Sequence, residues 1–269
     1  MDTAVTFDAL FPLASILVTL PTWVTGLLII VGLPVLVTVL QALIRHRFPV
    51  LSLRRHNDVA GFLLAVIGVI YAVSAGFILI DLHDARNEAK SAAHSEALTL
   101  LAIAQQSRVM GPDAQRRITA RVVAYENAVI GSWPPGEGSA EAPPRALERL
   151  QTEMEGLRPT TQTQEAFVWE ASRRLMEAGI EHQELEVEAA DGSLDVLLWI
   201  AVIISSAATL AFCLVFGLEN ARLHYLMVAG VTIVIAVNLF LIVELNYPFK
   251  GDLSVRPDVA EHVIRELGR

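Results

Sequence analysis

The chain has 269 residues, of which 20 are Lys or Arg and 29 are Asp or Glu, so its formal net charge is -9. Four stretches contain none of these charged residues and together hold 102 positions: 9–44, 59–80, 196–218 and 223–243. Because a helix of about 20 apolar residues crosses the hydrocarbon core of a bilayer, this composition excludes a wholly soluble enzyme, a secreted disulfide scaffold and a disordered chain. The other 167 residues carry all 49 charges, a density typical of water-exposed protein.

The cysteine content and the charge distribution exclude further kinds of site and partner. The single cysteine, Cys213, lies in the third apolar stretch, so neither an intramolecular disulfide nor a CxxC metal site can form. Residues 81–195 hold 20 acids and 11 bases, which disfavours a nucleic-acid partner. No Lys or Arg precedes the first apolar stretch, so we expect that stretch to be retained and not to act as a cleaved secretory signal.

The first apolar stretch is longer than one span, and Pro21 divides it. We expect residues 9–20 to form an interfacial or re-entrant segment. Residues 23–44 should form the first spanning helix, with Trp23 at the depth of the lipid headgroups.

The second spanning helix covers residues 59–80, and no Gly or Pro interrupts the chain after it until Gly111. This helix is therefore predicted to run on as a polar stalk to about Val109. Its membrane half carries small residues at steps of three and four, which would let another helix approach closely. These are Gly61, Ala65, Gly68, Ala72 and Gly76.

Three further polar helices are expected at 113–130, 145–157 and 161–189, the first with Ile118, Val122 and Val129 at helical spacing. Spans three and four, 194–217 and 223–243, should form a hairpin, and a short amphipathic helix should end the chain.

The predicted fold is an all-α, polytopic membrane protein with four transmembrane helices and a helical extramembrane domain inserted between helices two and three. Helices two and three are both expected to continue unbroken into that domain. The predicted parts are 1–82 (interfacial segment and helices one and two), 83–193 (helical domain), 194–244 (hairpin) and 245–269 (polar tail).

Enzyme signatures are missing from the sequence, which has no GxSxG, HExxH or P-loop motif. His83 with Asp84, and Glu181 with His182, could meet as metal ligands, but residues on a solvated helix face are the favoured interpretation. We therefore predict a protein that is not an enzyme, with no catalytic residue, cofactor or metal.

Polar residues gather where the ends of helices two, three and four should adjoin. Groups at membrane depth mark either a pathway or a packing network, and capping or binding of lipid headgroups explains them equally well. The cluster comprises Arg54, Arg55, His56, Asn57, Asp58, Glu219, Asn220, Arg222 and His224.

The tail after the fourth span forms a second motif, for which a structural clamp is the favoured interpretation. Pro248 stops the helix, Gly251 permits a turn, and Asp252 can cap a helix or pair with an arginine. With Glu244 and Phe249, these residues form the predicted tail site.

The two sides of the membrane carry nearly equal numbers of Lys and Arg in their short segments. The higher density in the loop 45–58, and the usual dominance of the first helix, favour a cytoplasmic location for this Arg-rich loop. The helical domain would then lie outside.

Four sequence segments resemble the bacterial bestrophin-like membrane family of unknown function: 20–23, 56–62, 222–224 and 247–255. The resemblance implies a bacterial inner-membrane protein and a distant relation to bestrophins, which are pentameric anion channels whose second helix lines the pore. It also implies a cytoplasmic segment between helices two and three, which conflicts with the orientation inferred from charge.

Three classes of function remain, in order of preference. The first is a homo-oligomeric ion channel or channel-like protein in the lipid bilayer, which we expect to conduct anions, with helix two on the axis. The second is a membrane-anchored sensor or scaffold whose acidic helical domain binds a partner or ligand. The third is an intramembrane enzyme that uses His56, Asp58 and His224.

For the channel, helix two supplies an apolar constriction that could gate by dewetting. Its candidate residues are Leu63, Ile67, Ile70 and Phe77. Arg54 and Arg55, repeated in each subunit, would form a ring that favours anions, although they could equally fix the topology or bind anionic lipid.

Overall fold

The computed structural model describes residues 17, 20–47, 57–135, 143–191, 193–215, 220–252 and 254–269, and these contain helices and connections but no strand. They form two compact units, one from residues up to 85 together with 193–253, and one from 86–192 together with 254–269. In the described part of the chain, four helices are long and apolar enough to cross a membrane. The predicted all-α fold with four spans is therefore confirmed.

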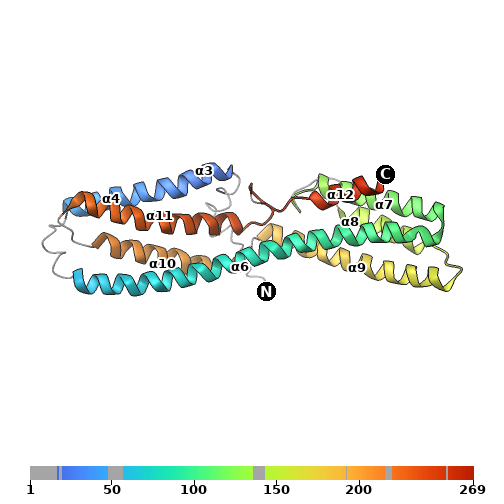
Figure 1. Cartoon of the computed structure of the whole chain (residues 1–269), viewed down its shortest axis with the longest axis horizontal. Coiled ribbons are helices and arrows are strands. Elements are labelled where there is room, and N and C mark those ends of the chain that lie inside the picture. The colour runs from blue at the N-terminus through green and yellow to red at the C-terminus, as the bar shows by residue number, and fades with distance from the viewer. Residues whose placement is uncertain are drawn as a thin grey trace, which may run out of the picture. The chain divides into compact units, whose positions relative to one another are not determined.

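The first span begins directly after Pro21, as predicted, but it is not a uniform α-helix. It consists of α3 (Thr22–Leu27), a π-helical turn η1 (Leu28–Gly32) and α4 (Leu33–Arg47). Pro21 stands where a helix tolerates proline, because the first residues have no intrahelical acceptor for their N–H groups. In Figure 1 this span runs beside α11 (Ala221–Leu245).

The second span and the predicted stalk form one helix, α6 (Asn57–Gln106), which has 50 residues. At 1.5 Å per residue it is about 75 Å long. The 3-10 turn η2 (Ser107–Met110) ends it, and Gly111 follows with a φ of 93°, a conformation that favours glycine. The membrane part of α6 packs on α10 (Val196–Val215) and α11 through the core residues Ile78, Leu82, Trp199, Val202, Ile242 and Val243.

The prediction that helix three continues unbroken from the domain is wrong. The last domain helix, α9, covers Gln162–Asp191, and α10 begins only at Val196. Asp195 starts the new helix, because its side-chain Oδ1 accepts a hydrogen bond from the backbone N of Leu197 at 2.7 Å. The break is also held by Asn246, whose backbone O and side-chain Oδ1 accept from the backbone N of Ser193 and Leu194 at 2.9 and 2.8 Å.

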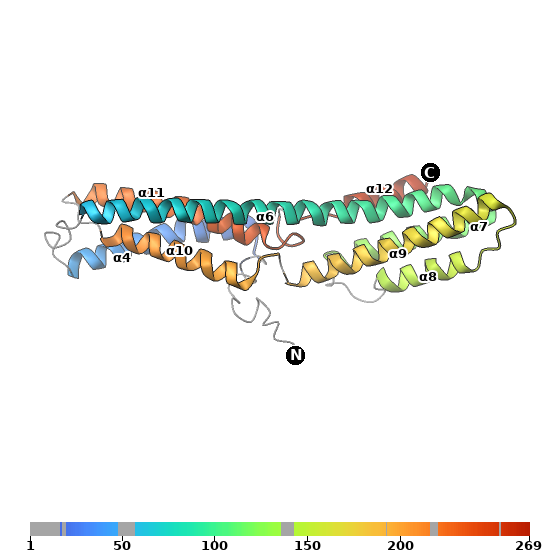
Figure 2. The ribbon, with the colours of Figure 1, turned by 90° about the horizontal axis from the view of Figure 1, so that it is seen from below.

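The second unit is a helical bundle, seen well in Figure 2. The later part of α6 packs with α7 (Pro112–Gly131), α8 (Pro143–Glu155), α9 and α12 (Asp258–Leu267) around one core. Ile118, Val122 and Val129 all lie in this core, as their helical spacing predicted.

The tail does not form a part of its own, since 246–252 belong to the first unit and 254–269 to the second.

Candidate functional site

The membrane half of α6 has one face that its own chain leaves uncovered. Of the predicted constriction residues, Leu63, Ile70 and Phe77 are exposed, with Phe77 at 69%, and Ile67 is half-buried. In the most apolar 18-residue segment of α6, 17% of the residues are buried, compared with 33% in α10 and in α11. The first span is as exposed as α6. In a bilayer, this face must contact lipid, another protein chain or an aqueous path.

The small residues of α6 also face away from the packed interior of the chain. Ala65 and Ala72 are exposed, and Gly61, Gly68 and Gly76 are half-buried. A Cβ atom added at Gly68 or Gly76 would meet nothing within 4 Å. Packing within one chain therefore does not require glycine at these two positions.

The predicted polar cluster at the helix ends is only partly described. Arg54, Arg55, His56 and Glu219 lie outside the described residues, and Asn57 and Asp58 are the first residues of α6. Asn220 caps α11, since its Oδ1 accepts from the backbone N of Arg222 at 3.1 Å and of Leu223 at 3.2 Å. Arg222 is exposed, whereas His224 is buried with its Nε2 3.4 Å from the backbone O of Cys213. Capping thus accounts for Asn220.

The tail site is a set of polar contacts between segments far apart in sequence. Glu244 is 3% exposed, and its Oε2 accepts a hydrogen bond from the Thr22 hydroxyl at 3.0 Å. The same hydroxyl accepts from the backbone N of Asp252 at 3.2 Å, and Asp252 Oδ2 accepts from the backbone N of Thr22 at 3.3 Å. Pro248 and Phe249 are buried, and Gly251 has a φ of 79°. Because these groups use one another as partners, the geometry favours a clamp over a ligand site.

A second polar cluster, which the sequence analysis did not single out, lies in the core of the helical bundle. Glu96 on α6 is 4% exposed; its Oε1 accepts from the Tyr125 hydroxyl and lies 3.2 Å from Nδ1 of His182. The rings of Tyr125 and His182 meet edge to face, 6.0 Å apart. His182 Nε2 lies 3.6 Å from Oε1 of Glu186.

The surroundings of this cluster shift its proton affinities. Burial lowers the pKa of His182, but the hydrogen bond and charge of Glu96 and the charge of Glu186 outweigh it, so that the pKa is raised. Burial, followed by the charge of Glu96, raises the pKa of Tyr125 well above its ordinary value, so its hydroxyl remains a donor. Glu96 is therefore a buried carboxyl group with two donors around it.

Glu126, the neighbour of Tyr125 on α7, has a different environment. It is 1% exposed, and its Oε1 has no hydrogen-bond partner among the described residues. Burial, and then the charge of Glu96, raise the pKa of Glu126 to about 8. A cavity of about 20 Å³ lies against both glutamates, with His94, Trp133 and Arg256 also in its wall.

The helical spacing of α7 carries a signal that would have identified Glu126. Glu126 follows Val122 by four residues and precedes Val129 by three, so it lies on the buried stripe predicted for this helix. An acidic residue on such a buried stripe is a candidate for a shifted pKa and hence for a functional site. His182 was noted only as a possible metal ligand, and no group of three or more His, Cys, Asp or Glu in the described chain is arranged to hold a metal ion.

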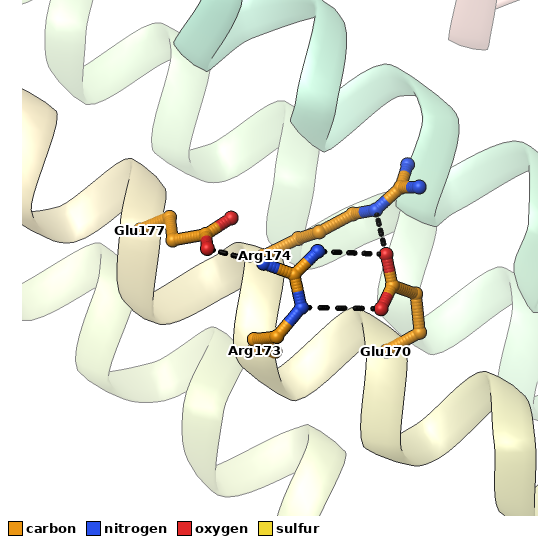
Figure 3. A network of polar contacts seen from close by, with 4 residues as sticks. All are labelled: Glu170, Arg173, Arg174 and Glu177. Carbon is orange, nitrogen blue, oxygen red and sulfur yellow. Dashed lines mark hydrogen bonds and ion pairs between the residues drawn. The ribbon is translucent and has the colours of Figure 1, made fainter.

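The charged network on α9 is of another kind, because it lies at the surface. Glu170 accepts hydrogen bonds from Arg173 and Arg174, and Arg173 also pairs with Glu177 (Figure 3). These hydrogen bonds lower the pKa of the Glu170 carboxyl to about 2. All four residues lie within two turns of one helix, so the network stabilises α9 locally and presents no convergent site.

Taken with its fold, the exposed apolar face of α6 places the chain among multi-pass α-helical membrane proteins that carry a helical domain between spans two and three. A family model for the Bestrophin-like domain matches residues 31–260, which is most of the chain. The chain belongs to the bestrophin-like family, and the resemblance inferred from its sequence motifs is confirmed.

Solved structures with the same fold come from a bacterium. A bacterial bestrophin homologue from Klebsiella pneumoniae aligns over 88% of this chain and 97% of its own, with a TM-score of 0.69 at 14% sequence identity. A single-substitution variant of that protein aligns over 91% and 96%, with a TM-score of 0.70 at 15% identity. No curated protein matches this sequence significantly.

Proposed function

We propose that the protein is a homo-oligomeric ion channel of a bacterial inner membrane, in which α6 of each copy lines a common axis. The observation that carries this proposal is the uncovered membrane face of α6, where exposed large apolar residues lie beside glycines that no contact within the chain requires. A single chain with four spans has no room for an aqueous path, so conduction needs several copies. Closed cyclic symmetry is the usual solution.

In this arrangement Leu63, Ile67, Ile70 and Phe77 form an apolar constriction that gates by dewetting. The stripe from Gly61 to Gly76 packs against a helix of a neighbouring copy, because small residues allow close approach of backbones where no hydrophobic effect drives association. Arg54 and Arg55 form a ring at the mouth that favours anions, and their loop lies in the cytoplasm. We predict that the protein has no enzymatic activity.

Current through planar bilayers that contain the purified protein tests conduction. The lining role of α6 is tested by thiol modification, for which the chain is well suited, since Cys213 is its one cysteine and is buried. In a Cys213→Ala background, a charged thiol reagent should reduce the current of Phe77→Cys. The matched control is Leu197→Cys on α10, which is 75% exposed and should face lipid.

Block of both variants, or of neither, would contradict an axis lined by α6. Silence under both anion and cation gradients, from protein that is shown to be folded and oligomeric, would contradict channel activity.

A second candidate, a membrane-anchored sensor or scaffold, is favoured by the surface of α9. Two grooves of about 480 and 510 Å³ share Met176 in their walls, and Trp169 beside one of them is 70% exposed. A silent channel assay, together with quenching of tryptophan fluorescence by an added ligand that is lost in Trp169→Phe, would favour this alternative.

A further inference from the structure

The buried cluster of the helical bundle contains two acids with unequal surroundings. Glu96 has the Tyr125 hydroxyl and Nδ1 of His182 beside its Oε1, so this buried oxygen has polar partners. Glu126 lacks such a partner for Oε1 in the described chain, although the residue is 1% exposed. A buried carboxylate without donors carries a large desolvation cost, whereas a protonated carboxyl group does not.

A cavity that both glutamates line can complete the hydrogen bonding of Glu126. It measures about 20 Å³ and touches both glutamates. A single water molecule needs about 10–15 Å³ and polar partners, so the cavity has room for one. This water would accept the proton of Glu126 in a hydrogen bond and donate towards Glu96.

We infer that Glu96 and Glu126 form a proton-binding site, in which one proton and one negative charge are shared by two carboxyl groups and a bridging water molecule. This site depends neither on ion conduction nor on oligomerisation. The charged and titratable groups that face the site are His94 on α6, Tyr125 on α7, Glu181, His182 and Glu186 on α9, and Arg256 before α12. Arg256 is exposed, so water screens its charge.

The sign of the pH dependence follows from proton linkage. The pKa of Glu126 is about 8 in the fold and 4.5 for an ordinary glutamate, so the folded chain binds more protons between these values. The stability that the proton contributes is complete at low pH and is lost as pH rises through about 8. Above that pH, the charge on the buried Glu126 carboxylate destabilises the fold.

The test compares the full-length protein in lipid nanodiscs with Glu126→Gln, which mimics the protonated acid, between about pH 6 and about pH 9. The unfolding midpoint of the unsubstituted protein should fall across this range, whereas that of Glu126→Gln should fall less. Glu148→Gln on α8 is the matched control, because Glu148 is exposed, and it should follow the unsubstituted protein. Equal pH slopes for all three proteins would overturn the inference.

A spectroscopic measurement keeps the inference testable even where Glu126→Gln does not fold. Infrared titration of the unsubstituted protein should show the C=O stretch of a protonated carboxylic acid at neutral pH, and this band should disappear with a midpoint above pH 7. Where the variant folds, it should lack the band. Absence of any such band at neutral pH would overturn the proton site.

Discussion

At the scale of residues, Glu244 shows what the sequence could not reveal. The polar types in the tail were recognisable, because proline ends a helix and glycine allows a turn. The partner of Glu244, however, is Thr22, which lies 222 positions away in sequence. No local pattern encodes such a pair, since it depends on how the spans pack. The same reason explains why Glu96 and His182, 86 positions apart, were not connected.

Replacing Thr22 by valine tests the clamp with little change in side-chain shape. The change removes the donor to Glu244 and leaves a buried carboxyl oxygen without that partner, which should destabilise the protein by about 1–3 kcal/mol. Chemical unfolding in detergent measures the effect. Thr152→Val is the control, because this hydroxyl bonds only to the backbone O of Glu148 on an exposed face. Equal losses for the two variants would contradict a clamp.

Replacing Gly251 by alanine tests the turn in the same motif. The φ of 79° disfavours any residue with a Cβ, and the new atom would lie 3.3 Å from Oε2 of Glu244. We expect a loss of about 1–2 kcal/mol in unfolding free energy. Gly131→Ala at the end of α7 should cause no loss, since its Cβ would meet nothing within 4 Å. An unfolding free energy of Gly251→Ala equal to that of the unsubstituted protein would contradict this prediction.

At the scale of elements, the helices were predictable wherever composition decided them. Stretches without charge gave the four spans, and the absence of Gly and Pro after Ile80 indicated one long α6. The π-helical turn at Leu28–Gly32 was not predicted, although it contains Gly32, and Pro34, which has no backbone N–H for a helical hydrogen bond, follows two residues later. The break before Val196 was missed because its stabilising groups include Asn246, which is remote in sequence.

Gly179 provides a test of how two of these elements pack. A Cβ at this position of α9 would lie 2.9 Å from Cδ2 of Leu147 on α8. Gly179→Ala should therefore overpack the contact and destabilise the protein by about 1–3 kcal/mol, measured by thermal or chemical unfolding. In the double variant with Leu147→Ala the two losses should be less than additive, because the clash is gone. Simple additivity would contradict the close approach.

At the scale of the whole molecule, the chain has the fold of the bestrophin-like family, and in the channel that we propose the selectivity would depend on residues at its mouth. Because Arg54 and Arg55 lie outside the described residues, their ring stays a prediction from the sequence. The family resemblance and the density of Lys and Arg in the short segments predict opposite sides of the membrane for the helical domain.

Replacing Arg54 and Arg55 together by glutamine should remove the preference for anions while leaving assembly intact. A ring of positive charge raises the local anion concentration, and neutral side chains do not. The reversal potential under a salt gradient measures the change, and size-exclusion chromatography measures assembly. Arg116→Gln, on the exposed face of α7, should leave the selectivity unaltered. Unstable or inverted protein with unchanged selectivity would instead assign the pair to topology.

Because α6 is unbroken, the number of residues in it sets the direction in which each side chain points about the helix axis. Each residue inserted near position 87 would turn every later side chain by about 100° about the helix axis and move it by about 1.5 Å. Seven inserted residues would restore the angle to within about 20°. A linker of loop residues would tolerate such changes, whereas an unbroken helix passes each of them on to the helical residues that follow. Insertions of one, three or five residues should therefore be far less tolerated than an insertion of seven.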